Sequence, residues 1–201
     1  MFSLFSNSKA NEHTKPVQAG FSLIELMVSI SIIVLVVAVI IVQQTSFNGS
    51  VLLRNEAYEV ALTLRNIQLS AVSASVNNGS FRALYGAHFN IGSLTNGAFS
   101  IFKDADADGF YDSTEAFGAQ GVIDPRFEIR DVRTIGDTYN SALGLSVVFE
   151  RPNFDARFFD SAGEVNASSV EIDIARRGVT GTGVEVVRTV EITAAGQISV
   201  Q

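Results

Sequence analysis

The sequence contains no cysteine and only two histidines among its 201 residues. Without cysteine, neither a disulfide framework nor a thiolate metal site can form, so an exported domain must rely on its core or on a ligand for stability. His13 lies near the N-terminus, and we interpret His88, in a β-rich stretch, as a packing or hydrogen-bonding residue. No HExxH, GxSxG or P-loop motif is present, so a membrane-anchored enzyme is the least favoured class.

Positive charge is also scarce. The formal net charge is -7, and because residues 1–20 carry +1 (Lys9 and Lys15 against Glu12), the remainder carries -8. An acidic domain argues against generic nucleic-acid binding, which needs positive charge to displace counterions. It is better suited to divalent cations.

What the sequence does have is one long apolar run. Residues 21–42 give 22 positions, about 33 Å as a helix, which is enough to cross a bilayer core. Basic residues precede the run and the acidic domain follows it, so the positive-inside rule places the N-terminus in the cytoplasm. Glu25 interrupts the run, and a charge at the centre of a spanning helix costs about 2.5–3.5 kcal/mol. Such a carboxylate suggests a function and needs a partner.

A second, amphipathic helical half is expected over residues 48–78. Apolar residues recur there at intervals of three and four, and they are Leu53, Ala57, Val60, Ala61, Leu64, Ile67, Ala71 and Ala74. Polar residues, including Glu56 and Gln68, are assigned to the other faces. Gly49 predicts a bend or local melting, and Asn77-Asn78-Gly79 predicts the end of the helix.

Beyond Gly79 the chain is β-rich. The expected strands are Phe81–Asn90, Ala98–Phe102, Arg126–Val132, Leu145–Phe149, Ala156–Phe159, Val170–Ala175, Val184–Thr193 and Ile198–Val200. Thr180–Gly183 indicates a hairpin connection, and Arg176-Arg177 is interpreted as a solvated basic pair. Core positions are assigned to Phe127, Phe149, Phe154, Phe158 and Phe159. The fold class is therefore α+β, with a long N-terminal helix whose second half packs on an antiparallel sheet.

The segment Gly20-Phe21-Ser22-Leu23-Ile24-Glu25, followed by the apolar run, resembles the class III signal of type IV pilins and type II secretion pseudopilins. The resemblance implies a type IV pilin-like fold and cleavage after Gly20 by prepilin peptidase, with N-methylation of Phe21. It also implies export from the inner membrane into a filament, with other pilin subunits and an inner-membrane assembly platform as partners. Glu25 would then pair with the cationic amine of Phe21. The alternative is an ordinary single-pass anchor with an incidental glutamate.

This resemblance divides the chain into a leader (1–20), a transmembrane or filament-core helix (21–47), an amphipathic helix (48–78) and an exterior domain (79–201). Residues 55–74, 158–163 and 190–198 are similar to the GspH/FimT subgroup of minor components. Some FimT-like members bind DNA through a basic closing turn. Here that turn contains no arginine (196–199, GQIS), so no nucleic-acid partner is expected. The resemblance implies a structural role in protein secretion or in a pilus; the alternative is a calcium-dependent tip adhesin or a receptor for exoprotein cargo.

A second motif lies at residues 104–115, where "DADADGFYDSTE" fits the pattern of an EF-hand calcium loop. Calcium takes six to eight oxygen ligands, and Gly109 permits the sharp turn that the loop requires. The expected ligands, with Phe110 contributing its backbone carbonyl, are Asp104, Asp106, Asp108, Phe110, Asp112 and Glu115. We expect a structural Ca²⁺ that stabilises a domain without disulfides; the alternative is a solvated acidic turn.

Overall fold

The computed structural model describes residues 20–73, 84–90, 97–140, 143–149, 153–181 and 186–201, with no side-chain description for 42–48. The chain divides into two compact units, Met1–Gln43 and Gln44–Gln201. Residues 1–19 of the predicted leader, Ala74 and the predicted helix end at 77–79 lie outside the described residues.

The first unit consists of the N-terminal part of helix α1, which is assigned over Leu23–Ser73. Leu23–Ile41 has a mean hydropathy of 3.0 and is long and apolar enough to cross a membrane. These side chains are exposed in the isolated chain, as expected of a segment that packs against lipid or other subunits. At Gly49 the prediction of local melting is wrong, because the glycine and its neighbours are helical. Gly49 is buried and packs against Arg176, which supports the helix there.

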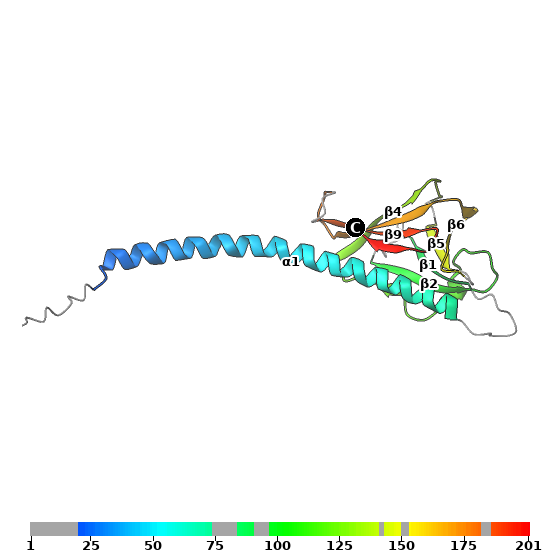
Figure 1. Cartoon of the computed structure of the whole chain (residues 1–201), viewed down its shortest axis with the longest axis horizontal. Helices are drawn as coiled ribbons and strands as arrows, with labels where there is room; N and C mark the ends of the chain where they lie inside the picture. The colour runs from blue at the N-terminus through cyan, green and yellow to red at the C-terminus, as the bar shows by residue number, and fades with distance from the viewer. Residues whose placement is uncertain (1–19, 74–83, 91–96, 141–142, 150–152, 182–185) are drawn as a thin grey trace, which may run out of the picture. The chain divides into compact units, whose positions relative to one another are not determined.

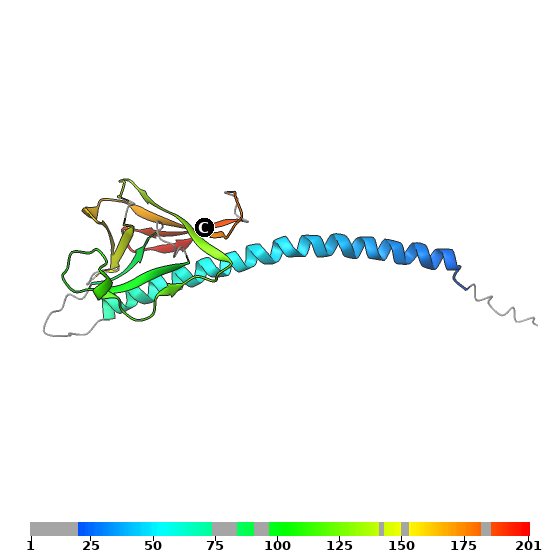
Figure 2. The same ribbon diagram turned by 180° about the vertical axis from the view of Figure 1, so that it is seen from behind.

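The second half of α1 lies against the strands of the β-rich unit, as Figures 1 and 2 show from opposite sides, and its apolar stripe belongs to the core there. The predicted stripe is confirmed from Leu53 to Ala71, where every member is no more than 6% exposed. Glu56 and Gln68, which the pattern places on other faces of the helix, are nevertheless buried, each 8% exposed. Both are buried because they bond to the β-rich unit. The Glu56 carboxylate accepts from the Asp124 amide at 2.9 Å, and the Gln68 amide donates to two carbonyls.

Two antiparallel sheets complete the β-rich unit, where a single sheet was the simplest expectation. The six-stranded sheet has the order β3-β2-β1-β5-β6-β7, and the four-stranded sheet has the order β10-β9-β8-β4. Their strands are β1 (Leu84–Phe89), β2 (Ala98–Asp104), β3 (Gly121–Val122), β4 (Phe127–Ile135), β5 (Leu145–Phe149), β6 (Ala156–Asp160), β7 (Gly163–Val165), β8 (Ser169–Arg176), β9 (Val187–Thr193) and β10 (Ile198–Val200).

All eight predicted strands are present. Leu145–Phe149 and Ile198–Val200 have the predicted bounds, and the others differ at their described ends by one to three residues. Positions 81–83 and 184–185 of the predicted strands lie outside the described residues. Two short strands, β3 and β7, and the 3-10 turn η1 (Ser113–Glu115) were not predicted. β3 and β7 are too short to show a period-two pattern, and each is held by pairing with a longer neighbour. β8 and β9 form the expected antiparallel pair, while half of the predicted hairpin connection lies outside the described residues.

The apolar interior forms two clusters. The larger one joins the α1 stripe to both sheets and includes Phe127, Phe149 and Phe158. The smaller one consists of Leu84, Phe102, Val148 and Phe159, with Tyr111 packed against it. Phe154 was wrongly assigned to the core: it is 49% exposed and lies between β5 and β6, in a segment whose carbonyl bonds to Gln68.

Candidate functional site

The N-terminal motif leads directly into α1. Gly20 and Phe21 precede the helix, and the Ser22 hydroxyl accepts a hydrogen bond from the Ile24 amide at 3.2 Å. This contact satisfies one of the free amides that every helix start exposes. Glu25 lies in the first turn, where a negative charge opposes the positive end of the helix dipole. Glu25 therefore follows, four residues along the chain, the terminus that cleavage after Gly20 would create.

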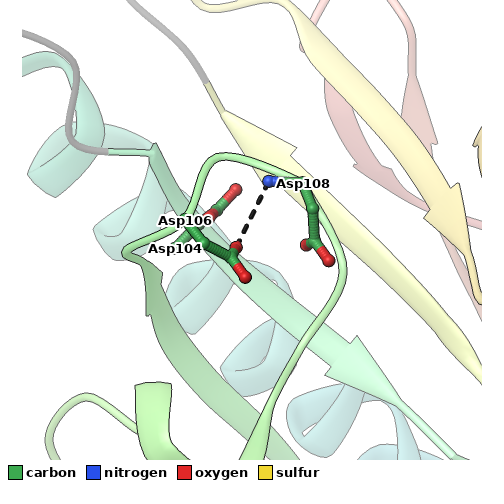
Figure 3. A group of neighbouring side chains, drawn as sticks. All are labelled: Asp104, Asp106 and Asp108. Carbon is green, nitrogen blue, oxygen red and sulfur yellow. Dashed lines mark hydrogen bonds between the residues drawn. The ribbon is translucent and has the colours of Figure 1, made fainter.

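The acidic loop begins at the end of β2 and closes at η1. Asp104, Asp106 and Asp108 are brought together, each offering an oxygen within 4.8 Å of the others (Figure 3). Asp104 is 4% exposed and anchors the group, since its two oxygens accept from the amides of Ala107 (2.6 Å) and Gly109 (2.8 Å). Asp106 and Asp108 are exposed, and the Asp108 amide lies 3.4 Å from an Asp106 oxygen.

These three carboxylates fit one calcium ion in spacing. Calcium–oxygen distances of about 2.3–2.6 Å place ligands on opposite sides of the ion about 5 Å apart, close to the 4.8 Å limit of the group. The loop turns sharply at Ala107 and Gly109, with φ of +66° and +81°. At Gly109 a side chain would also collide with the Phe159 ring, so both the backbone angle and the lack of space require glycine there.

The carboxylates of Asp112 and Glu115 do not join this group. Glu115 is 9% exposed, and its two oxygens accept from the amides of Ala105 (2.7 Å) and Asp112 (3.2 Å). In this arrangement Glu115 clamps both ends of the loop. Burial raises the pKa of the Asp104 carboxyl, with Glu115 and Asp106 adding repulsion against its two amide bonds. A cation at this position would relieve that repulsion.

The loop is docked on the outer face of the six-stranded sheet through His88. The imidazole packs edge-on to Phe110 (5.1 Å between centroids) and stacks on Tyr111 (5.2 Å). The buried Ser146 hydroxyl accepts from the Tyr111 amide at 3.2 Å and lies 2.9 Å from His88 Nδ1. Ser146 and Nδ1 are thus hydrogen-bonded, and the ring also bonds to the backbone of Leu143. Burial lowers the pKa of His88 to about 4, so the ring is neutral at pH 7.

The sequence indicated a hydrogen-bonding role for His88 but not its partner. Ser146 stands in an apolar strand, LSVVF, and nothing in that pattern separates a buried serine from a solvent-facing one. Only the pairing of β1 with β5, which places His88 opposite Ser146, brings the two together.

Residues 15–41 match the family model described as the prokaryotic N-terminal methylation motif. The match includes Gly20, Phe21 and Glu25 and ends at the last residue of the membrane-length segment. It indicates a class III signal of the type IV pilin family, and proteins with this motif are structural subunits processed by prepilin peptidase. No curated protein and no solved structure matches the chain.

With the motif in place, the apolar helix fits a single-pass inner-membrane anchor. The antiparallel sheets that follow this helix in the chain are consistent with an α+β, pilin-like fold.

Proposed function

We propose that this chain is a minor pilin or pseudopilin, cut after Gly20, methylated at Phe21 and assembled through α1 into a filament. The observation that carries the proposal is the methylation motif, which leads without interruption into helix α1. The second half of that helix forms part of the core of a folded domain. The first unit supplies exposed apolar side chains, as a subunit needs if neighbours are to cover them.

Glu25 fits this role as an assembly residue. Once the leader is removed, the new amine of Phe21 is a cation four residues away, on the same chain or on a neighbour. Pairing in a low-dielectric surrounding rewards correct register, because an unpaired buried charge is strongly destabilising. Methylation leaves the amine positive.

Mass spectrometry of the mature protein tests the processing step. In a host with prepilin peptidase, the chain should begin at N-methyl-Phe21, and Gly20→Ala should retain residues 1–20. The same chain in a host without the peptidase is the control and should also keep its leader. An intact Met1 terminus in the peptidase-positive host would contradict the proposal.

We further propose that the loop 104–115 holds a structural calcium ion. Support comes from the spacing of the three aspartates and from the burial of Asp104 and Glu115. The remaining proposed ligands are the Phe110 carbonyl, Asp112 and Glu115. Of these, Glu115 would have to turn at least one oxygen from its amide bonds to the ion. Binding would tie down a loop that covers the smaller apolar cluster.

Thermal unfolding of the detergent-solubilised chain, with and without millimolar calcium, tests this site. Binding to the folded state alone adds about 2.7 kcal/mol at one hundred times Kd, so the midpoint should rise by several degrees. Asp106→Asn should remove the gain without lowering the calcium-free midpoint, because Asp106 is exposed. The matched control is Asp155→Asn, an exposed acid outside the loop, which should keep the gain. No rise in the wild type would exclude the site.

The assignment to the GspH/FimT subgroup, and to a type II secretion pseudopilus or a type IV pilus, is part of this proposal. The buried stripe of α1 and the tight turn at Gly196 support the subgroup, since both fall in the segments that resemble it. A calcium-dependent tip adhesin or cargo receptor is the second candidate, favoured by the loop's exposed acids. Loss of secretion, of twitching or of surface adhesion on gene deletion distinguishes the three.

A further inference from the structure

Arginines gather at the end of the β-rich unit where α1 enters it. Arg126, Arg176 and Arg177 line an open pocket of about 480 Å³ together with Gly49, Leu52 and Pro125. The chain beyond Gly20 carries a net charge of -8, so this local excess of positive charge departs from the rest of the molecule. Guanidinium groups present a planar fork of donors that matches the oxygens of a phosphate.

Arg176 is the central residue of this pocket. Its guanidinium lies against α1, and a Cβ on Gly49 would approach Nη1 to 2.7 Å, so the glycine makes room for the charge. Among the described residues, no carboxylate pairs with Arg176, whereas Arg126 is paired with Asp124 at 2.8 Å. Arg177 stands 3.9 Å from Glu128, at the limit of an ion pair. Arg176 and Arg177 thus retain donors for a ligand.

Another arginine of the four-stranded sheet has an unpaired nitrogen. Arg188 lies opposite Ile174, two residues before Arg176 on β8, and its Nε is buried without a hydrogen-bond partner in the part of the chain that the structure describes. Burying an unpaired donor is costly, so Arg188 is unusual on the sheet that also carries Arg176.

The pocket is close in sequence to the membrane-length segment. That segment ends at Ile41, eight residues before Gly49. Eight residues span about 28 Å when fully extended and about 12 Å as a helix. Either distance keeps the pocket within reach of the polar layer of a bilayer that holds Leu23–Ile41. Apolar surface adjoins the charge, since Leu52 lines the pocket and is 38% exposed.

We propose that this pocket binds the phosphate of an anionic phospholipid headgroup, with Arg176 and Arg177 as the main donors. The apolar rim favours an amphiphile over a free anion, and the short connection to the spanning segment supplies the lipid at high local concentration. The inference rests on the membrane anchor in the proposed function. Lipid bound here holds the β-rich unit at the membrane surface until the subunit is extracted for assembly.

A single introduced thiol makes the pocket observable, because the chain has no cysteine. Thr180→Cys, in the exposed turn after Arg177, can carry an environment-sensitive fluorophore. The detergent-solubilised full chain is titrated separately with short-chain phosphatidylglycerol, short-chain phosphatidylcholine and inorganic phosphate. Each basic residue near an anionic surface contributes about a fivefold gain in affinity. Arg176→Gln should therefore raise the apparent Kd for phosphatidylglycerol about fivefold, and adding Arg177→Gln should raise it about 25-fold.

The matched control is Arg157→Gln, which removes an exposed arginine of β6 paired with Glu164 and should leave the Kd unchanged. Equal affinities for the two lipids would overturn the proposal, as would phosphate binding as tightly as phosphatidylglycerol, which would define a free-phosphate site. If the Arg176→Gln variant does not fold, Arg177→Gln alone is titrated in its place. Flotation with vesicles distinguishes failure of the lipid pocket from failure of the membrane anchor. A chain that floats but shows no lipid preference has its anchor and contradicts the pocket alone. A chain that does not float contradicts both the anchor and the pocket.

Discussion

Gly196 shows how a single residue can be decisive for this fold. It joins β9 to β10 with φ of +78°, and a Cβ there would lie 1.7 Å from the Phe154 carbonyl oxygen. The Gln68 amide donates to that carbonyl and to the Gly196 carbonyl, so helix, turn and the segment before β6 meet at one point. The two nearest atoms belong to the Phe154 backbone, which cannot move aside as the end of a flexible side chain could.

Gly196→Ala should therefore destabilise the protein far more than its backbone angle alone requires. The control is Gly178→Ala, where φ is +74° and nothing lies within 4 Å of the added Cβ. A left-handed alanine costs about 1–2 kcal/mol, and this is the expected loss for Gly178→Ala. The loss for Gly196→Ala should exceed it by about 2 kcal/mol or more, as for other forced overpacking. Equal shifts in thermal unfolding would show that the clash is relieved elsewhere.

At the scale of elements, the second half of α1 is held by polar as well as apolar contacts. Its stripe fills the larger cluster, while Glu56, Arg65 and Gln68 reach across to backbone groups of the β-rich unit. The apolar contacts are non-directional, so by themselves they would allow the helix to shift along the sheets. The directional bonds of these three side chains specify one register of the helix on the sheets.

Gln68→Leu tests this register. The substitution keeps the bulk but leaves the carbonyls of Phe154 and Gly196 without their donor, at about 1–3 kcal/mol for each buried group that stays unpaired. The thermal midpoint should fall by several degrees. Ser70→Ala on the exposed face, where the hydroxyl bonds only to the Asn66 carbonyl, should change it little. A midpoint that survives Gln68→Leu would mean that packing alone sets the register.

For the whole molecule, two effects of acid on stability oppose each other. The net charge is -7 at pH 7 and the pI is about 4.8, so general repulsion falls as the pH drops toward 5. His88 acts in the opposite direction. Its pKa is about 4 in the folded state, lowered by burial, against about 6.5 when unfolded. The unfolded chain therefore takes up the proton first, and the stability that neutral His88 contributes above pH 6.5 is lost as the pH falls to about 4.

This difference corresponds to about 3 kcal/mol. The thermal midpoint of the wild type should decline between about pH 6.5 and pH 4, and His88→Asn should flatten the decline while lowering stability at pH 7. The pKa of Asp124 is held at about 2 by its bonds to Arg126. The stability that this carboxylate contributes is therefore lost only below about pH 4, outside the range in which His88 acts. A parallel decline in both proteins would assign the acid sensitivity to other groups.

Local pattern in the sequence determined the helix, its buried stripe and the eight longer strands, because periodicity of apolar residues directly reports which face is covered. The motif around Gly20, Phe21 and Glu25 likewise depends on adjacent residues, and the family model recognises the same segment. The acidic spacing of residues 104–115 predicted a calcium loop, and this stays a prediction.

Only the tertiary structure decided which polar residues are buried and what they bond. Glu56 and Gln68 have the polarity of surface residues, and the partners that bury them are 68 to 128 positions away. Ser146 meets His88 across a strand pair, and Arg176 meets Gly49 where the four-stranded sheet ends against α1. Such pairs depend on strand register and helix docking, which arise from the packing of the whole unit and leave no local periodicity in the chain.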